Sequence, residues 1–383
     1  MSEETGGEAP PFALQRLGVV MEPQPGDPNE AWGVLNPAAA RGLDGELYLF
    51  PRLVAEGNYS RIGIARVVFD PAGIPAGVER LGLALEPREP YELNAQTGGG
   101  VEDPRVTLVQ PLHLYVMAYT ALGPAGPRVA LATSPDLFHW TRLGPLRFAP
   151  EGRRDLNAYA NKDAAFFPDV VADPHGHPAL AVLHRPSLRV PTGPDVVGRA
   201  DVPGRAGRES IWLSYVSLEP ARRSPTALTE TYGHRVLATP QQPWEALKIG
   251  GGPPPLRTPL GWLVIYHGVS GRYPTGILVR PALSYSAGVL VLDGDDVLTT
   301  RYRSPQPILA PELEEERFGI VPNCVFPTGL DPQARSAVDV YYGMADARIG
   351  VARLALPSTL PPPPPRRPGL PDDGSLAPVP EAR

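Results

Sequence analysis

One carboxylate and three cationic side chains are the residue types in this chain that could carry out a glycosyl transfer. Asp103 follows residues 98–101, a Gly-Gly-Gly-Val run whose tight and partly apolar approach is expected to raise its pKa toward that of a general acid. Arg185, Lys248 and His267 supply cations, which bind anions but do not activate water as bases. Because a bound phosphate dianion can itself be the nucleophile, these residues predict an inverting glycoside phosphorolysis in which Asp103 protonates the leaving oxygen.

Lysine is rare in this chain. Of its 35 lysine and arginine residues only two are lysines, Lys162 and Lys248, and both lie in short polar or Gly-rich phrases. Biased codon use explains the general excess of arginine. A planar guanidinium cannot replace a compact ammonium group in a tight pocket, so the remaining lysines are expected at constrained functional positions. For Lys162 a buried salt bridge is the alternative interpretation.

The elements that must position these residues recur five times along the chain. An apolar, partly aromatic strand is expected at 46–52, 113–119, 179–185, 261–267 and 338–343, and a second strand at 62–66, 128–133, 211–215, 276–280 and 349–353. A closing strand that begins with Arg is expected at 80–87, 142–145, 235–240 and, in a looser version, 308–311. The fifth unit lacks such a strand after Arg353, but a similar segment occurs at 16–23.

This repetition predicts an all-β fold, a five-bladed β-propeller over residues 12–357 that the N-terminal strand closes. Closure of the ring removes the sheet edges that an open array would expose. Residues 1–11 are expected to form a flexible N-terminus. The Pro-rich residues 358–383 are expected to form a disordered or polyproline tail, because they lack the apolar residues needed for a core.

Composition narrows the class of protein. The chain has 383 residues, a formal net charge of -6 and one cysteine, Cys324, which excludes an intramolecular disulfide. It contains no basic block suited to nucleic acid and no run of 18 apolar residues that could span a membrane. The start of the chain has neither the basic region nor the apolar run of a signal peptide, so a cytoplasmic location is expected.

Polar residues at similar places in successive units are expected to meet around the axis of the ring, where strand ends and loops converge. They are Asn36 and Arg52; Glu102, Asp103 and Arg105; Lys162, Asp163, His184 and Arg185; Lys248 and His267; and Asn323 and Asp346. Each alone is weak evidence, since an Asp-Pro pair is usually a turn and a His at a strand end is usually a satisfied core residue. As a set they predict one substrate site.

Eight segments together resemble glycoside hydrolase family 130. They are Asn36-Pro37, Gly100-Val-Glu-Asp-Pro-Arg105, Thr133-Ser-Pro-Asp-Leu-Phe-His-Trp140, Lys162-Asp-Ala-Ala-Phe-Phe-Pro168, His184-Arg-Pro186, Lys248-Ile-Gly-Gly-Gly-Pro253, Gly261-Trp-Leu-Val-Ile-Tyr-His-Gly268 and Tyr341-Tyr-Gly-Met-Ala-Asp346. That family consists largely of β-mannoside phosphorylases with a five-bladed propeller. The resemblance covers nearly all of the chain except its first residues and the Pro-rich tail.

The resemblance implies a role for each site residue and an enzyme of the phosphorylase type within the glycosyltransferases. Asp103 would be the single general acid, whose proton in part of the family passes through the sugar 3-hydroxyl. Arg185, Lys248 and His267 would bind phosphate. The implied substrate-binding residues are Asn36, Arg52, Arg105, Lys162, Asp163 and Asp346. The implied partners are a β-mannoside and inorganic phosphate as co-substrate, with no metal and no other cofactor.

Two features depart from the family pattern. Some relatives carry a basic residue where this chain has Ala160, and an Arg-rich insertion at 187–209 lengthens the third unit on the acceptor side. Hydrolytic members of the family lack the cationic residues and use carboxylates instead. Retention of Arg185, Lys248 and His267 therefore favours the phosphorolytic branch.

Three other functions stay open at this stage. One is an inverting β-mannosidase that uses water, with Asp163 or Asp346 as the base. The others are a non-catalytic sugar-binding propeller, which the complete Asp103 motif disfavours, and a furanosidase propeller, whose site would use three acidic residues. The sequence leaves open the linkage cleaved (β-1,2 or β-1,4), the acceptor sugar, the role of the tail and whether the chain forms a homo-oligomer.

Overall fold

Segments rich in Val, Leu, Ile and aromatic residues form strands throughout the chain. The computed structural model describes residues 11–94, 98–152, 155–188, 208–273, 282–333 and 336–361. The all-β fold predicted from the sequence is confirmed, and the α-helices within this described part are α1 (Leu218–Arg223) and α2 (Glu314–Arg317). Residues 1–10, most of the 187–209 insertion and the tail from 362 lie outside the described residues.

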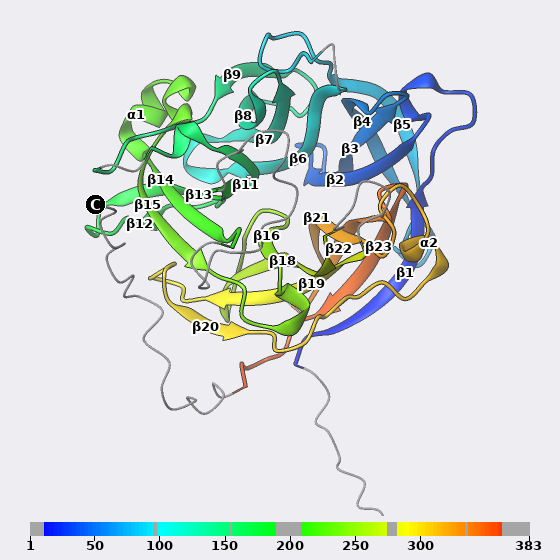
Figure 1. Cartoon of the computed structure of the whole chain (residues 1–383). Helices are drawn as coiled ribbons and strands as arrows, with labels where there is room; N and C mark the ends of the chain where they lie inside the picture. The colour runs from blue at the N-terminus through cyan, green and yellow to red at the C-terminus, as the bar shows by residue number, and fades with distance from the viewer. Residues whose placement is uncertain are drawn as a thin grey trace, which may run out of the picture.

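The described strands fall into five antiparallel groups (Figure 1). The first group is β2 (Gly33–Arg41), β3 (Leu47–Ala55), β4 (Tyr59–Phe69) and β5 (Pro75–Leu85), and the second is β6 (Gly99–Val109), β7 (Leu114–Gly123), β8 (Gly126–Ser134) and β9 (Thr141–Pro145). The third is β11 (Ala160–Phe166), β13 (Pro178–Ser187), β14 (Ile211–Ser217) and β15 (Glu230–Ala238), with short β10 (Arg147–Phe148) and β12 (Val171–Ala172) beside it. The fourth is β16 (Lys248–Gly251), β18 (Gly261–Arg272), β19 (Ala282–Leu292) and β20 (Thr300–Arg303), with β17 (Leu256–Thr258) beside β18. The fifth is β21 (Val325–Gln333), β22 (Ala337–Met344), β23 (Arg348–Ala355) and β1 (Ala13–Met21).

The groups are arranged around a common centre, and β2, β6, β11, β16 and β21 lie nearest to it (Figure 1). These inner strands contact one another in sequence, β2 with β6, β6 with β11 and β11 with β16, while β21 contacts β2. The residues predicted to form the site are carried largely by these strands and by the strands that pair with them.

The first two groups share one eight-stranded sheet, whereas the sequence predicted a separate sheet for each unit. The connection is a parallel pairing of β4 with β6, in which Ser60 lies opposite Gly100. A Cβ at Gly100 would lie 2.2 Å from the Ser60 carbonyl oxygen, and one at Gly98 would lie 2.5 Å from the Gly57 carbonyl oxygen. The Gly run before Asp103 therefore permits close backbone approach between the two groups.

The core consists of buried clusters between neighbouring groups. Alternate residues of β18 serve two of these clusters: Trp262, Val264 and Tyr266 pack toward the third group, and Leu263 and Ile265 pack toward the fifth. Strands buried on both faces explain why their sequences are almost continuously apolar. A further cluster packs β1, β2 and β3, from the first part of the chain, against β22 and β23, from its last part.

A buried Glu paired with an Arg on the outer strand recurs from group to group. The pairs are Glu30–Arg80 (2.8 Å), Glu92–Arg142 (2.8 Å), Glu245–Arg303 (2.6 Å) and Glu316–Arg16 (2.8 Å), with a longer and more exposed Glu151–Arg235 contact (3.6 Å) in the third group. Each of the four short pairs joins the loop before an inner strand to the outermost strand of the same group.

This ion pair identifies the outer strand of the last two groups. Arg16 places β1 in the fifth group, where it pairs antiparallel with β23, as the sequence predicted for the N-terminal strand. In the fourth group Arg303 marks β20 as the outer strand. The prediction of a strand at 308–311 was wrong, since Leu309 forms only an isolated bridge with Ala287. The predicted strand at 276–280 lies outside the described residues, and β19 is the strand that pairs with β18.

Candidate active site

Three inner strands use the same backbone irregularity to direct a polar side chain into the site. Asn36 in β2, Asp103 in β6 and Asp163 in β11 have φ values of 45°, 46° and 56°. Each coincides with a register shift in the pairing of its strand, as in a β-bulge. Asn and Asp tolerate left-handed backbone better than other L residues, which accounts for these residue types at this position.

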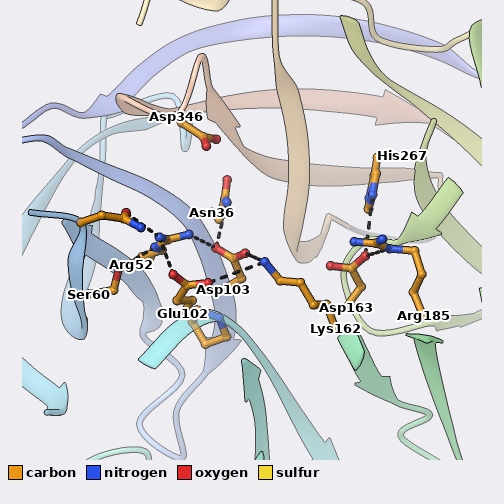
Figure 2. Close-up of polar contacts among 12 residues, drawn as sticks. Asn36, Arg52, Ser60, Glu102, Asp103, Lys162, Asp163, Arg185, His267 and Asp346 are labelled. Carbon is orange, nitrogen blue, oxygen red and sulfur yellow. Dashed lines mark hydrogen bonds and ion pairs between the residues drawn. The ribbon is translucent and has the colours of Figure 1, made fainter. Parts of the chain in front are cut away.

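Asp103 lies in a group of buried and half-buried polar side chains that we call the acid cluster: Asn36, Arg52, Glu102, Asp103, Lys162 and Asp346 (Figure 2). Asn36 Nδ2 donates to Asp103 Oδ1 at 2.9 Å, and Arg52 donates to the same oxygen at 3.3 Å and to Glu102 at 2.7 Å. Lys162 Nζ lies 3.6 Å from Glu102 and 3.9 Å from Asp103. The cations of this cluster thus neutralise Glu102 and Asp103 together.

The expectation that Asp103 has a raised pKa was wrong. Burial by itself raises the pKa of Asp103, but Arg52, followed by Lys162 and Arg105, lowers it by more, and the net pKa lies below the usual range. Arg52 keeps its charge because Glu102 and Asp103 raise its pKa by more than burial lowers it. In the free protein Asp103 is therefore a carboxylate.

Asp346 differs from the other carboxyls of the acid cluster. It lies in the turn between β22 and β23 with a φ of 52°, and Cys324 Sγ approaches its Oδ1 at 4.0 Å. Burial raises the pKa of Asp346 to about 6, since the attraction of Arg52 only partly offsets it.

A second group of residues, which we call the cation cluster, consists of Asp163, Arg185, Glu209, Lys248 and His267. Arg185 donates to Asp163 Oδ2 at 2.5 Å and also pairs with Glu209. His267 Nε2 lies 3.7 Å from the same Asp163 oxygen (Figure 2). Burial raises the pKa of Asp163, but the neighbouring cations, Arg185 first, lower it by more, so that Asp163 is ionised.

His267 is fully buried and has a neutral ring. Burial lowers the pKa of His267 to about 3, and Asp163 offsets this only in part. The ring packs 4.4 Å from the Phe326 ring, and neither of its nitrogens has a hydrogen-bond partner in the structure. A buried imidazole with both nitrogens unpaired is costly unless a ligand completes it.

Arg105 connects the two clusters. Its Nε donates to the Gly252 carbonyl at 2.7 Å and its Nη1 to the Asp103 carbonyl at 2.8 Å. The side chain is 1% exposed and its Nη2 has no partner. Arg105 therefore contacts the backbone of β6 and of the residue that follows β16, and its Nη2 amino group is left unpaired.

The Gly250-Gly251-Gly252 segment of β16 leaves space between the charged groups. A Cβ at Gly250 would lie 2.3 Å from Asp163 Oδ2 and 2.5 Å from His267 Cε1. Lys248 begins the same strand, and its ammonium lies 5.7 Å from the centre of the Tyr285 ring.

The structure places most of the predicted residues together and two elsewhere. The acid cluster contains Asn36, Arg52, Asp103, Lys162 and Asp346; the cation cluster contains Asp163, Arg185, Lys248 and His267; and Arg105 lies between them. Asn323 is exposed at the turn before β21.

His184 belongs to a buried chain of hydrogen bonds beneath the site. It contacts Asn161 at 3.0 Å and Ser214 at 2.7 Å, and Ser214 contacts His234 at 2.8 Å. His184 is thus the satisfied core histidine that strand-end histidines usually are.

Sequence reasoning missed the role of Glu102 and Glu209. Glu102 was visible in the same motif as Asp103, and its pairing with Arg52 could have been suspected from their adjacent units. Glu209 had no such signal, because it ends the insertion of the third unit and reaches Arg185 only through the fold.

Among the described residues, no group of three or more His, Cys, Asp or Glu side chains is arranged to hold a metal ion. None of the helices in the described part is long and apolar enough to cross a membrane.

The chain is similar to several proteins that are named as mannoside phosphorylases. A family profile for glycoside hydrolase 130, described as beta-1,4-mannooligosaccharide phosphorylase, matches residues 224–359. The 1,2-beta-oligomannan phosphorylase of Thermoanaerobacter sp. is 30% identical over 67% of this chain and 69% of its own length. The Beta-1,2-mannobiose phosphorylase of the same organism is 31% identical over 67% of both chains. The solved Beta-1,2-Mannobiose phosphorylase of Listeria innocua superposes with a TM-score of 0.65 at 23% identity, covering 90% of this chain and 97% of the other, and so shows a shared fold.

Proposed function

Since this chain belongs to glycoside hydrolase family 130, we propose that it cleaves β-mannosides with inorganic phosphate and releases α-mannose 1-phosphate with inversion. The five strand groups would form a closed five-bladed propeller, in support of which β1 pairs with β23 and a buried cluster joins the first and last groups. The site lies among the inner strands of that ring.

The observation that carries this function is the set of buried, incompletely paired nitrogens beside the acid cluster. Both ring nitrogens of His267 and the Nη2 amino group of Arg105 are unpaired, within a protein interior where such groups are normally satisfied. Together with Arg185 and Lys248 they provide a cationic, donor-rich lining for an anion. A phosphate bound here would accept hydrogen bonds from Arg105 Nη2 and from the protonated ring nitrogen of His267.

The two clusters divide the reaction between them. The acid cluster holds the mannosyl ring and supplies the proton to the leaving oxygen through Asp103. Phosphate in the cation cluster attacks the anomeric carbon from the opposite side, which inverts its configuration. Arg105 fixes the separation of the clusters, since it binds the backbone of both β6 and Gly252.

A β-1,2-linked mannoside is the first substrate to test. The two relatives that match two thirds of their own length are named as phosphorylases of β-1,2-linked mannosides, whereas the family profile is described by a β-1,4 activity. The acceptor sugar would bind beyond Asp103 on the side of the third strand group.

The second candidate function is an inverting β-mannosidase. It is favoured by two carboxylates, Asp163 and Glu209, that lie in the cation cluster where a base would be needed. Both contact Arg185, which holds the pKa of Asp163 low and makes Asp163 a weak base.

Assays of β-1,2- and β-1,4-mannobiose with and without phosphate separate the two functions. The phosphorylase gives α-mannose 1-phosphate at a rate that saturates with phosphate. In His267→Ala the phosphate KM should rise far more than the mannoside KM, because a charge-assisted hydrogen bond contributes about 1.5–3 kcal/mol. Release of free mannose at an equal rate without phosphate would instead establish the hydrolase.

A further inference from the structure

Arg185 pairs with two carboxylates at once. Its Nε donates to Asp163 Oδ2 at 2.5 Å, and its Nη1 forms an ion pair with Glu209. A guanidinium binds phosphate best through two parallel N–H groups, either those of Nε and Nη2 or those of Nη1 and Nη2. Asp163 occupies the first of these edges and Glu209 occupies the second. A bidentate phosphate on Arg185 therefore requires one of the two carboxylates to leave.

Asp163 is held in place by its surroundings. Its side chain is almost completely buried, and its Oδ2 also lies 3.7 Å from His267 Nε2 (Figure 2). Gly250 borders the same oxygen so closely that a Cβ on this glycine would lie 2.3 Å from it. A carboxylate enclosed in this way would lose its partners and gain no contact with water if it turned away from Arg185.

Glu209 is placed differently. Its side chain is 19% exposed, which leaves the carboxylate a path to solvent. Its backbone is fixed beside β16, because the Glu209 carbonyl accepts a hydrogen bond from Ile249 N at 3.1 Å and the residue forms an isolated bridge with Lys248. A glutamate side chain reaches several rotamers from a fixed backbone. Glu209 can therefore release Arg185 by a change of rotamer, without movement of the strand.

We propose that Glu209 occupies the anion position on Arg185 in the free protein and is displaced when phosphate binds, so that this carboxylate sets the phosphate affinity of the site. The choice of phosphate rests on the proposed function, whereas the exchange of anions on Arg185 rests on the ion pairs. A phosphate that bound beside Glu209 would bring two anions together in a partly buried site, where like charges repel strongly. Displacement removes this repulsion and frees the end of the guanidinium for phosphate.

Calorimetric titration of the full chain with inorganic phosphate, without any sugar, measures this competition. Glu209→Gln and Glu209→Ala should each lower the phosphate Kd by at least about tenfold, because phosphate no longer has to displace a charged group from Arg185. A misfolded variant cannot imitate this result, since it would lose phosphate binding and not gain it. Equal or weaker phosphate binding by both variants would overturn the proposal.

Glu219→Gln in α1 is the matched control. It removes the same charge from the third strand group, where Glu219 is exposed and pairs with Arg222 at 2.8 Å. Because exposed ion pairs contribute little, the phosphate Kd of this variant should equal that of the unmodified protein. A gain in affinity as large as that of Glu209→Gln would trace the effect to net charge and contradict a specific role of Glu209.

Carbon-13 NMR of the unmodified protein, labelled at the glutamate carboxyls, follows the displacement directly. The Glu209 signal, assigned by its loss in whichever Glu209 variant folds, should move as phosphate saturates the site. The Glu219 signal should stay constant. If the Glu209 signal also stays constant at saturating phosphate, its ion pair with Arg185 survives binding and the proposal is wrong.

Mannoside assays separate this proposal from the proposed function. Tighter phosphate binding by the Glu209 variants, in a protein that does not phosphorolyse β-mannosides, would refute the function and support the exchange. Phosphorolysis at an unchanged phosphate KM in both variants would refute the exchange and support the function. Phosphate-independent release of mannose that Glu209→Gln abolishes would make Glu209 the base of a hydrolase and refute both.

Discussion

The ionisation of Asp103, the proposed acid, is set by the residues around it. Its Oδ1 accepts hydrogen bonds from Asn36 and Arg52, and both could also be accepted by the amide oxygen of an asparagine. Asp103→Asn should therefore keep the fold while lowering kcat by about 10²–10⁴-fold, the usual contribution of general acid catalysis. Steady-state kinetics measure the fall in kcat, and phosphate binding by calorimetry checks that the fold of the site is kept. Activity within tenfold of the unmodified protein would assign the acid to another residue.

Lys248 tests whether rare lysines mark tight sites. Its ammonium lies over the Tyr285 ring, and the strand that carries it continues into the crowded Gly250 position. A guanidinium is larger and planar, so Lys248→Arg should raise the phosphate KM nearly as much as Lys248→Ala does. Kinetics at varied phosphate compare the two variants. An arginine variant that retains most activity would show that the scarcity of lysine reflects codon use.

The sequence predicted which polar residues lie together at the inner strands better than it predicted their ionisation. The grouping of Asp103, Arg185 and His267 was predictable because each lies in a compact motif. The pKa of Asp103 could not, since it depends on Arg52 and Lys162 from two other strand groups, whose distances only the fold defines.

At the scale of elements, the inner strand β16 shapes the cation cluster because its glycines have no side chains. A Cβ at Gly250 would lie 2.3 Å from Asp163 Oδ2 and 2.5 Å from His267 Cε1. Gly250→Ala should therefore displace both groups and lower phosphorolysis by about 100-fold, as a shift of about 1 Å in a site can do. Activity assays on folded variants, verified by circular dichroism, measure this.

Gly77 in β5 offers a matched control for that substitution. A Cβ there meets no atom within 4 Å, and its φ lies outside the positive range. Gly77→Ala should leave activity unchanged. If Gly250→Ala were equally silent, β16 would not border the substrate.

The repeated strands were predictable because both of their faces are buried, which gives nearly continuous apolar runs. The outer strands were harder to predict, since they are short and partly exposed. β20 was missed for this reason, and only the pairing of Arg303 with Glu245 shows its equivalence to β5 and β9. The merging of the first two groups through Gly100 could not be foreseen, because it depends on contacts between backbones.

For the molecule as a whole, we expect stability to depend on how β1 is attached to the rest of the fifth strand group. Arg16 on β1 donates to Glu316 at 2.8 Å and to the Ala310 carbonyl at 2.7 Å, and Phe12 of the same segment is 2% exposed. Glu316 is buried, so loss of Arg16 leaves its charge without a cation. The equivalent pairs within the other groups join residues 50 to 58 positions apart, whereas this one joins residues 300 positions apart.

Arg16→Ala should therefore lower the free energy of unfolding by about 2–3 kcal/mol, the contribution of hydrogen bonds to a buried charged group. The effect should resemble that of Arg142→Ala, which removes the equivalent contact with Glu92 in the second group. Arg66→Ala is the matched control, because its pair with Glu79 is exposed and should contribute little. Urea unfolding of the three variants gives the comparison. If Arg16→Ala behaved like Arg66→Ala, β1 would be a weakly bound edge strand, and its attachment would contribute little to the stability of the fold.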